Sequence, residues 1–186
     1  MSTLHKAAFI DRDGVINEDR EYVHKIDDFE LIPGVISGLH LLHQTGYKLI
    51  VVTNQSGIAR GLYSEAMVEI LHQHMSMILK SNDIKLDSIY YCPHHPNGSI
   101  PEMAINCYCR KPKPGMLIRA AQELDLDLEK SIMIGDKLSD IQAGQSAGVK
   151  TTILVKSGHV VSPESALQAD LLADNLLDAA LKITIV

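Results

Sequence analysis

The chain has 186 residues, 46% of them hydrophobic, which is enough to bury one substantial core and short for two domains. Its 17 basic and 23 acidic residues give a net charge of −6, and only 4% of the residues are aromatic, so the composition argues against a nucleic-acid partner. No segment approaches the roughly 18 apolar residues of a membrane span, and the first residues lack a secretory apolar region. We therefore expect a cytoplasmic protein with no membrane partner.

Strand-like and helix-like segments alternate along the chain. Short apolar or β-branched runs predict strands at residues 7–10, 47–52, 88–91, 131–134 and 151–155. Amphipathic spacing predicts helices at residues 35–45, 64–80, 116–124, 138–147 and 175–180. Repeated strand–helix units indicate a parallel sheet with helices on both faces. We predict one α/β, Rossmann-like three-layer domain over residues 1–186, with no large cap domain.

The first predicted strand ends in Asp11-Arg12-Asp13-Gly14. In an open α/β sheet, ligands bind outside the carboxyl ends of the strands, so both acids are expected in the crevice. Two carboxylates this close repel each other unless a cation lies between them, and a hard cation such as Mg²⁺ prefers oxygen ligands. Taken alone, the two acids can also be read as turn formers before Gly14.

Further polar residues follow other predicted strands. They favour a cation-binding role for Asp11 and Asp13 over a role as turn formers. Thr53 and Asp136 each end a strand, and the basic pair Arg110-Lys111 precedes a helix. A dication, an ammonium and a hydroxyl at one sheet edge suit a phosphoryl group, whose oxygens they neutralise or hydrogen-bond. Asp11 is then the candidate nucleophile, and Asp13 the candidate general acid and base.

These residues resemble the four motifs of the haloacid dehalogenase-like phosphohydrolases. The motifs are Asp11-x-Asp13-Gly14, Thr53, Lys111 and Gly135-Asp136-x-x-x-Asp140. Longer stretches are similar to the heptose bisphosphate phosphatases within that superfamily, and this resemblance extends over nearly the whole chain except about the last thirty residues. The stretches are Asp11 to Gly14, Tyr22 to His24, Thr53 to Gly61, Cys92 to Pro96 and Cys109 to Pro112.

The resemblance implies a phosphatase that acts on a sugar phosphate in the synthesis of nucleotide-activated heptose. We expect the chain to be a monomer. The resemblance also implies that Asp11, Asp13, Thr53 and Lys111 are catalytic and that Mg²⁺ is held by Asp11, Asp13 and Asp136. It further implies substrate contacts from Asp19, Arg20, Glu21, Tyr22, Thr53, Asn54, Gln55, Ser56, Arg110, Lys111 and Lys137. The family has Gly where Glu21 stands, which leaves the substrate contacts of this loop open. The broader superfamily often has Thr where Val15 stands, a difference that should matter little.

All three cysteines lie in the loop from residue 92 to residue 109. Cys92-x-His94 followed by Cys107-x-Cys109 offers three thiolates and one imidazole, which suits a closed tetrahedral Zn²⁺ site of structural type. Spacing alone leaves three unlinked thiols as an alternative. The resemblance implies the zinc loop and His94 as its fourth ligand, with the neighbouring His95 as the competitor.

Two other functions stay open. A phosphoacceptor signalling module also uses a Mg²⁺-bound Asp on a doubly wound sheet, although Asp13, two residues on, favours turnover. Histidinol-phosphate phosphatase is the closer rival, because its relatives share the Cys-Pro-His and Cys-x-Cys-Arg-Lys-Pro stretches. The stretches Tyr22 to His24 and Ser56 to Gly61 favour the heptose enzyme, and the preferred anomer stays open.

Overall fold

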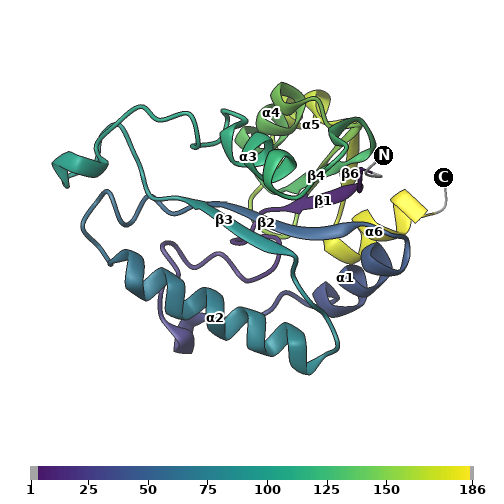
Figure 1. Ribbon diagram of the computed structural model, residues 1–186, viewed down its shortest axis with the longest axis horizontal. Helices are drawn as coiled ribbons and strands as arrows, with labels where there is room; N and C mark the ends of the chain where they lie inside the picture. Colours follow the sequence, from purple (N-terminus) through teal and green to yellow (C-terminus); the bar gives the residue numbers. More distant parts are fainter. Residues whose placement is uncertain (1–3, 185–186) are drawn as a thin grey trace.

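Six parallel strands form one sheet in the order β3-β2-β1-β4-β5-β6. The computed structural model describes residues 4–184, and within them β1 lies at the centre of the sheet between β2 and β4 (Figure 1). The strands are β1 (Ala7–Ile10), β2 (Lys48–Asn54), β3 (Ser88–Cys92), β4 (Ile132–Gly135), β5 (Thr151–Val155) and β6 (Leu171–Ala173).

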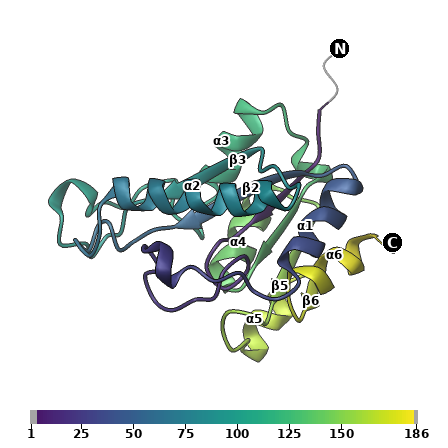
Figure 2. The same cartoon turned by 90° about the horizontal axis from the view of Figure 1, so that it is seen from below.

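Helices cover both faces of the sheet (Figures 1 and 2). One face carries α1 (Val35–Gln44), α2 (Glu65–Ser81) and α6 (Leu176–Thr184). The other carries α3 (Gly115–Glu123), α4 (Leu138–Ala147) and α5 (Pro163–Gln168). Short 3₁₀ helices lie at Ile26–Asp28, Pro101–Met103 and Leu128–Lys130. None of the helices within residues 4–184 has both the length and the apolar character needed to cross a membrane.

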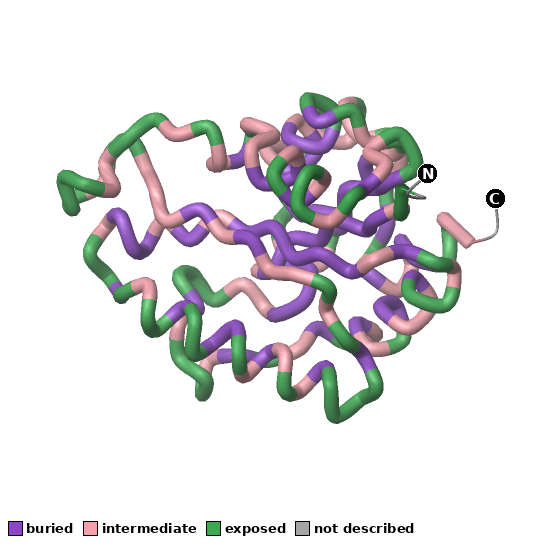
Figure 3. The backbone as a smooth tube through the Cα atoms, viewed as in Figure 1, coloured by how far each residue is buried: buried purple, intermediate pink, exposed green. Residues whose placement is uncertain are grey.

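The central strand shows why its sequence is apolar throughout. Ala8 and Ile10 pack into the core under α1, α2 and α6, whereas Ala7 and Phe9 pack into the core under α3 and α4. A parallel strand covered on both sides has no solvent face, so it loses the polar alternation of a half-exposed strand. Figure 3 shows the resulting buried layer along the middle of the molecule.

The helix boundaries follow local capping chemistry. The side chain of Ser64 accepts a hydrogen bond from the backbone N–H of Met67 at 3.3 Å and so caps the start of α2. Gly148 ends α4 with a φ of +81°, a left-handed conformation that glycine adopts without strain. The predicted start of the helix at Ser64 and the predicted end at Gly148 are both confirmed.

The predicted α/β fold with one parallel sheet is confirmed, with two differences. The second and third strands extend further than predicted, so that Thr53, Asn54 and Cys92 lie within strands rather than just after them. The elements α5 and β6 were not predicted, because six and three residues are too few to set up a readable periodicity.

Candidate active site

Strand register brings the predicted site residues to one edge of the sheet. Ile10 pairs with Val51 on β2 and with Ile134 on β4, and the backbone N–H of Asp11 continues the ladder by donating to the Ile134 carbonyl at 3.0 Å. Asp11 and Thr53 therefore lie at the same end of the sheet, just after the apolar residues of β1 and β2, as the sequence predicted.

Lys111 forms the charged centre of this edge. Its Nζ lies 2.9 Å from Oδ1 of Asp11 and 2.6 Å from Oδ1 of Asp140, and it donates to the Val52 carbonyl at 2.8 Å. All four residues are buried, so the ammonium is held by two carboxylates rather than by water. Burial raises the pKa of Asp11, the charge of Lys111 lowers it, and the neighbouring carboxylates raise it further. The resulting pKa is about 7.

Three buried carboxylates can share a cation here. Ligand atoms of Asp11, Asp136 and Asp140 lie within 4.8 Å of one another. Burial raises the pKa of Asp136, with the Asp140 charge as a further cause. Among the residues described, Oδ1 of Asp136 is buried and has no hydrogen-bond partner. Crowded carboxylates with an unpaired oxygen fit a hard divalent cation such as Mg²⁺.

Gly14 leaves room for this acidic cluster. Its φ is +83°, and a Cβ at this position would lie 2.4 Å from Oδ2 of Asp136. A side chain here would therefore both strain the backbone and displace a candidate metal ligand.

Asp13 lies beside the acidic cluster with its carboxylate in a different set of contacts. It accepts hydrogen bonds from Arg12, from Asn17 at 3.0 Å and from Gln55 at 3.0 Å. Burial alone would raise the pKa of Asp13, but the Arg12 guanidinium and these hydrogen bonds outweigh it and lower the pKa. The cluster of candidate metal ligands thus contains Asp140 where the sequence predicted Asp13.

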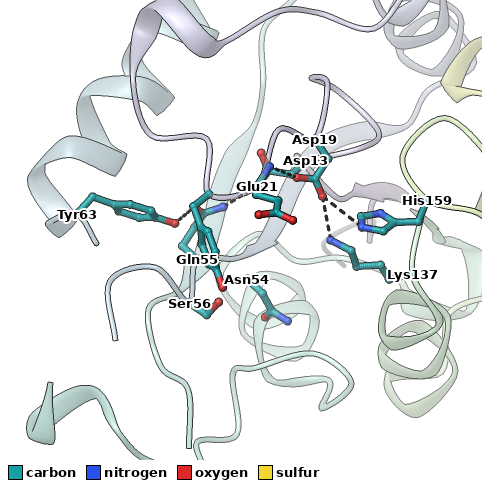
Figure 4. Close-up of a pocket in the computed structure, with 10 residues that line it drawn as sticks. Asp13, Asp19, Glu21, Asn54, Gln55, Ser56, Tyr63, Lys137 and His159 are labelled. Carbon is teal, nitrogen blue, oxygen red and sulfur yellow. Dashed lines mark hydrogen bonds and ion pairs between the residues drawn. The ribbon is translucent and has the colours of Figure 1, made fainter. Parts of the chain in front are cut away.

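Two adjacent cavities open at this edge. The smaller, of about 40 Å³, is lined by Asp11, Asp13, Thr53, Asn54, Lys111, Lys137, Ser139 and Asp140. The larger, of about 320 Å³, is lined by Asp13, Asp19, Glu21, Tyr22, Asn54, Gln55, Ser56, Tyr63, Lys137 and His159 (Figure 4). Asp13, Asn54 and Lys137 line both. A small anionic group can therefore sit against Asp11 while the rest of its molecule occupies the larger cavity.

The loop after β1 forms one wall of the larger cavity. Glu21 and Tyr22 have φ angles of +55° and +56°, which turn the chain sharply there. Asp19 accepts from the Glu21 N–H at 3.0 Å and pairs with Lys137 at 3.2 Å across the cavity. This wall is acidic at Asp19 and Glu21, and Lys137 is the cation that faces it.

Two predicted substrate contacts lie outside both cavity linings. Arg20 is exposed and forms an ion pair with Glu30. The guanidinium of Arg110 donates from Nη1 to the His94 carbonyl at 3.1 Å.

Four cavity residues received no role from the sequence: Tyr63, His159, Ser139 and Asp140. Asp140 carried a signal, because it closes the Gly135-Asp136-x-x-x-Asp140 motif. The hydroxyl of Tyr63 donates to Gln55 at 3.0 Å, and Nδ1 of His159 lies 2.5 Å from Oδ2 of Asp136. Neither contact has a local signature in the sequence.

The four predicted zinc ligands form a second cluster. The Sγ atoms of Cys92, Cys107 and Cys109 lie 3.1–3.4 Å apart, and Nδ1 of His94 lies 3.4 Å from Sγ of Cys109. A tetrahedral site with Zn–S bonds of about 2.3 Å has edges of about 3.8 Å, so only small shifts separate this cluster from a filled site. His95 points elsewhere, toward Arg60 at 3.2 Å and the N–H of Asn97 at 3.1 Å.

Comparison with known proteins places the chain in a family. The HAD-hydrolase-like family model matches residues 108–179. The chain is 51% identical over 172 residues to the D-glycero-beta-D-manno-heptose-1,7-bisphosphate 7-phosphatase of Escherichia coli K12, which covers 92% of this chain and 90% of that protein. The chain belongs to the heptose bisphosphate phosphatases. It is thus a phosphatase of the haloacid dehalogenase-like type, as its motifs predicted.

Other members of the family support the same assignment. The chain is 47% identical over 157 residues to the D-glycero-alpha-D-manno-heptose-1,7-bisphosphate 7-phosphatase of Photorhabdus laumondii, which covers 84% of this chain and 86% of that one. The crystal structure of D,D-heptose 1,7-bisphosphate phosphatase from B. bronchiseptica, complexed with magnesium and phosphate, is 32% identical. It superimposes with a TM-score of 0.84 and covers 97% of this chain and 98% of that chain. The family therefore includes a member seen with the metal and the anion for which this site is suited.

Proposed function

We propose that this chain removes the 7-phosphate of a D-glycero-D-manno-heptose 1,7-bisphosphate and leaves heptose 1-phosphate. We place the reaction in the cytoplasm, in the synthesis of nucleotide-activated heptose for a lipopolysaccharide core or surface glycan, with the chain acting as a monomer. The observation that carries the proposal is the pair of adjacent cavities with shared walls. Asp11 and Lys111 line the smaller one, and the larger one suits a sugar. The names of the relatives point to the same substrate class.

The first step transfers the phosphoryl group to the protein. A carboxylate oxygen of Asp11 attacks phosphorus, and the bond from phosphorus to the sugar oxygen breaks as an aspartyl-phosphate forms. Asp13, whose protonation is favoured by the negative charge of the bound phosphate against the effect of Arg12, donates its proton to the departing sugar oxygen. Lys111 and the hydroxyl of Thr53 hold phosphoryl oxygens, since both groups line the smaller cavity beside Asp11.

The second step releases phosphate. Asp13, now a carboxylate, takes a proton from a water molecule whose oxygen attacks phosphorus. The bond to Asp11 then breaks, inorganic phosphate leaves and both side chains return to their starting states. Asp13 suits both steps because it lines the cavity that holds the phosphoryl group and the cavity that holds the sugar.

Both metals of the proposal have donor sets that fit them. Asp11 and Asp136 would hold Mg²⁺, and Asp13 stays the proposed third ligand because Asp140 already pairs with Lys111 at 2.6 Å. The bound ion would supply positive charge against the phosphoryl oxygens. Cys92, His94, Cys107 and Cys109 would hold Zn²⁺, which supplies a structural cross-link when bound. The unpaired oxygen of Asp136 supports the first site, and the convergence of three thiols and an imidazole supports the second.

The second phosphate needs cations away from Asp11. Arg60 and Arg110 both lie against the segment His94-His95, at 3.2 Å and 3.1 Å from their partners there. Among the residues described, neither guanidinium has a carboxylate within ion-pair distance. We assign the 1-phosphate to this side of the site. We assign sugar contacts to Asp19, Arg20, Glu21, Tyr22, Asn54, Gln55, Ser56 and Lys137.

The test is phosphate release from both anomers of heptose 1,7-bisphosphate and from histidinol phosphate. Asp11→Asn keeps the shape of the nucleophile and removes its charge, so it should abolish release. Asp83→Asn makes the same change at an exposed turn, where Asn tolerates the left-handed backbone, and should leave release unchanged. Faster turnover of histidinol phosphate would overturn the substrate assignment, and near-normal release by Asp11→Asn would overturn the nucleophile.

A further inference from the structure

Arg12, which stands between the two catalytic acids in the sequence, is fully buried. Its exposed fraction is 0%, and it heads the fully buried side chains when they are ranked by volume. A buried guanidinium stays charged, so each of its N–H groups needs an acceptor inside the protein. The positions of those acceptors indicate what the residue does.

Most of the guanidinium is directed at Asp13. Nη2 of Arg12 donates to both carboxylate oxygens of Asp13 at 2.9 Å, and Nε donates to Oδ1 at 3.2 Å. Nη2 also donates to the Val23 carbonyl at 2.7 Å, which anchors the guanidinium to the loop after β1. The carboxylate of Asp13 is thus held in one orientation, at the point where the two cavities meet.

His72 on α2 supports the other end of the guanidinium. Its Nε2 lies 3.0 Å from Nη1 of Arg12, and the residue is only 6% exposed. Because Arg12 is always a donor, His72 must accept through Nε2 and carry its proton on Nδ1. Burial lowers the pKa of His72 to about 3, and the charge of Arg12 adds to the decrease, so the imidazole is neutral.

We propose that Arg12 is the positioning residue for Asp13, and that His72 holds Arg12 in place from α2. The planar fork of an arginine matches a carboxylate in a way that a lysine ammonium does not. The inference rests on the proposed function, because it assumes that Asp13 protonates the leaving oxygen. If so, α2 contributes to the reaction through His72 and Arg12, although His72 lines neither cavity.

A positioning role predicts a dependence on the leaving group. A sugar or alkyl alcohol leaves slowly unless it is protonated, whereas dinitrophenolate leaves without a proton. Misplacing Asp13 should therefore slow the release of an alcohol much more than the release of dinitrophenolate. A general loss of structure would slow both to the same extent.

The experiment measures kcat/KM on an alkyl phosphate and on dinitrophenyl phosphate, because this ratio reports on steps up to departure of the leaving group. Arg12→Met should lose about 10²-fold on the alkyl phosphate and less than about threefold on dinitrophenyl phosphate. His72→Leu, which leaves Nη1 without its acceptor, should show the same bias to a smaller degree. His72→Gln, which retains an acceptor, should recover most of the alkyl phosphate activity.

Two comparisons separate positioning from folding. Leu71→Ala creates a cavity in the core beside His72 on α2 and should lower stability with no bias between the substrates. In an Asp13→Asn background, Arg12→Met should add almost no further loss on the alkyl phosphate, because no acid remains to be positioned. If Arg12→Met does not fold, the contrast between His72→Leu and His72→Gln carries the test.

The outcomes distinguish the inference from the function beneath it. If Asp13→Asn shows no leaving-group bias, the acid role of Asp13 fails and the inference fails with it. If Asp13→Asn shows the bias while Arg12→Met and His72→Leu slow both substrates equally, the inference is overturned and the proposed function stands.

Discussion

The side-chain amide of Asn54 and the backbone of Lys111 are joined by two hydrogen bonds. Nδ2 of Asn54 donates to the Lys111 carbonyl at 3.1 Å, and Oδ1 accepts from the Lys111 N–H at 3.1 Å. The two residues are 57 positions apart in the sequence. One amide therefore fixes the segment that carries the ammonium beside Asp11.

Asn54→Asp should reduce kcat by about 10–100-fold, because a carboxylate cannot donate to the Lys111 carbonyl and misplaces Nζ. Asn82→Asp makes the same change at the exposed end of α2 and should leave kcat unchanged. Steady-state phosphate release from both variants, with circular dichroism to verify folding, is the measurement. Normal kcat in Asn54→Asp would mean that Lys111 needs no such support.

The stability of the metal-free protein should depend on pH through Asp11. Its pKa is raised from 3.8 to about 7 in the folded state, so between these values the folded protein holds a proton that the unfolded chain has lost. Stability should therefore fall as the pH rises through this interval. Asp13, whose pKa is lowered, acts in the opposite sense and only below pH 3.8.

Mg²⁺ should relieve this penalty, since it binds the ionised carboxylates. We expect a larger rise in Tm on adding Mg²⁺ near pH 8 than near pH 5, measured by thermal unfolding with and without a chelator. In Asp11→Asn the stability change between these two pH values should shrink. An equal Mg²⁺ effect at both pH values would contradict the assignment of Asp11 to the metal.

Two glycines with similar backbone angles offer a matched pair. Gly14 has a φ of +83° and would place a Cβ 2.4 Å from Asp136, whereas Gly148 has a φ of +81° and open space around it. Gly148→Ala should cost about 1 kcal/mol of unfolding free energy and leave activity intact. Gly14→Ala should cost at least as much and also weaken Mg²⁺ activation of phosphate release. Similar kinetics in the two variants would show that contact with Asp136 is unimportant.

Adjacent histidines test the zinc cluster. His94→Asn should lose the metal, because Nδ1 of His94 lies with the thiols, whereas His95→Asn should keep it. Elemental analysis should find about one zinc per chain in the wild type and in His95→Asn, and little in His94→Asn. His94→Asn should also unfold at a lower temperature. Zinc retained by His94→Asn and lost by His95→Asn would reverse the assignment.

The sequence predicted the fold and the meeting of strand ends well, because both depend on short-range patterns. An apolar run such as residues 7–10 predicts a buried strand, and parallel strands place their carboxyl ends at one edge. The proximity of Asp11 and Lys111 followed from that geometry. The strand β6, with three residues, left no comparable pattern.

Other features depend on tertiary contacts that no local pattern reveals. Arg12 between two acids reads as a solvated charge, yet it is the largest fully buried side chain. His159 reaches Asp136 from a loop 23 residues further along the chain. Asp140 carried a motif signal, but its ion pair with Lys111 became visible only in the folded arrangement.

Because β1 lies between two strands, the backbone at its end should open much more slowly than the loop that follows it. The amide of Asp11 is bonded to Ile134 within the middle of the sheet, so its hydrogen exchange should require unfolding of the whole core. The loop at Glu21 and Tyr22 is exposed and should exchange by local opening. In the proposed mechanism, bond breaking would thus lie on slowly exchanging backbone and sugar recognition on a rapidly exchanging loop. We therefore expect substitutions in that loop to alter the choice of sugar while leaving phosphoryl transfer intact.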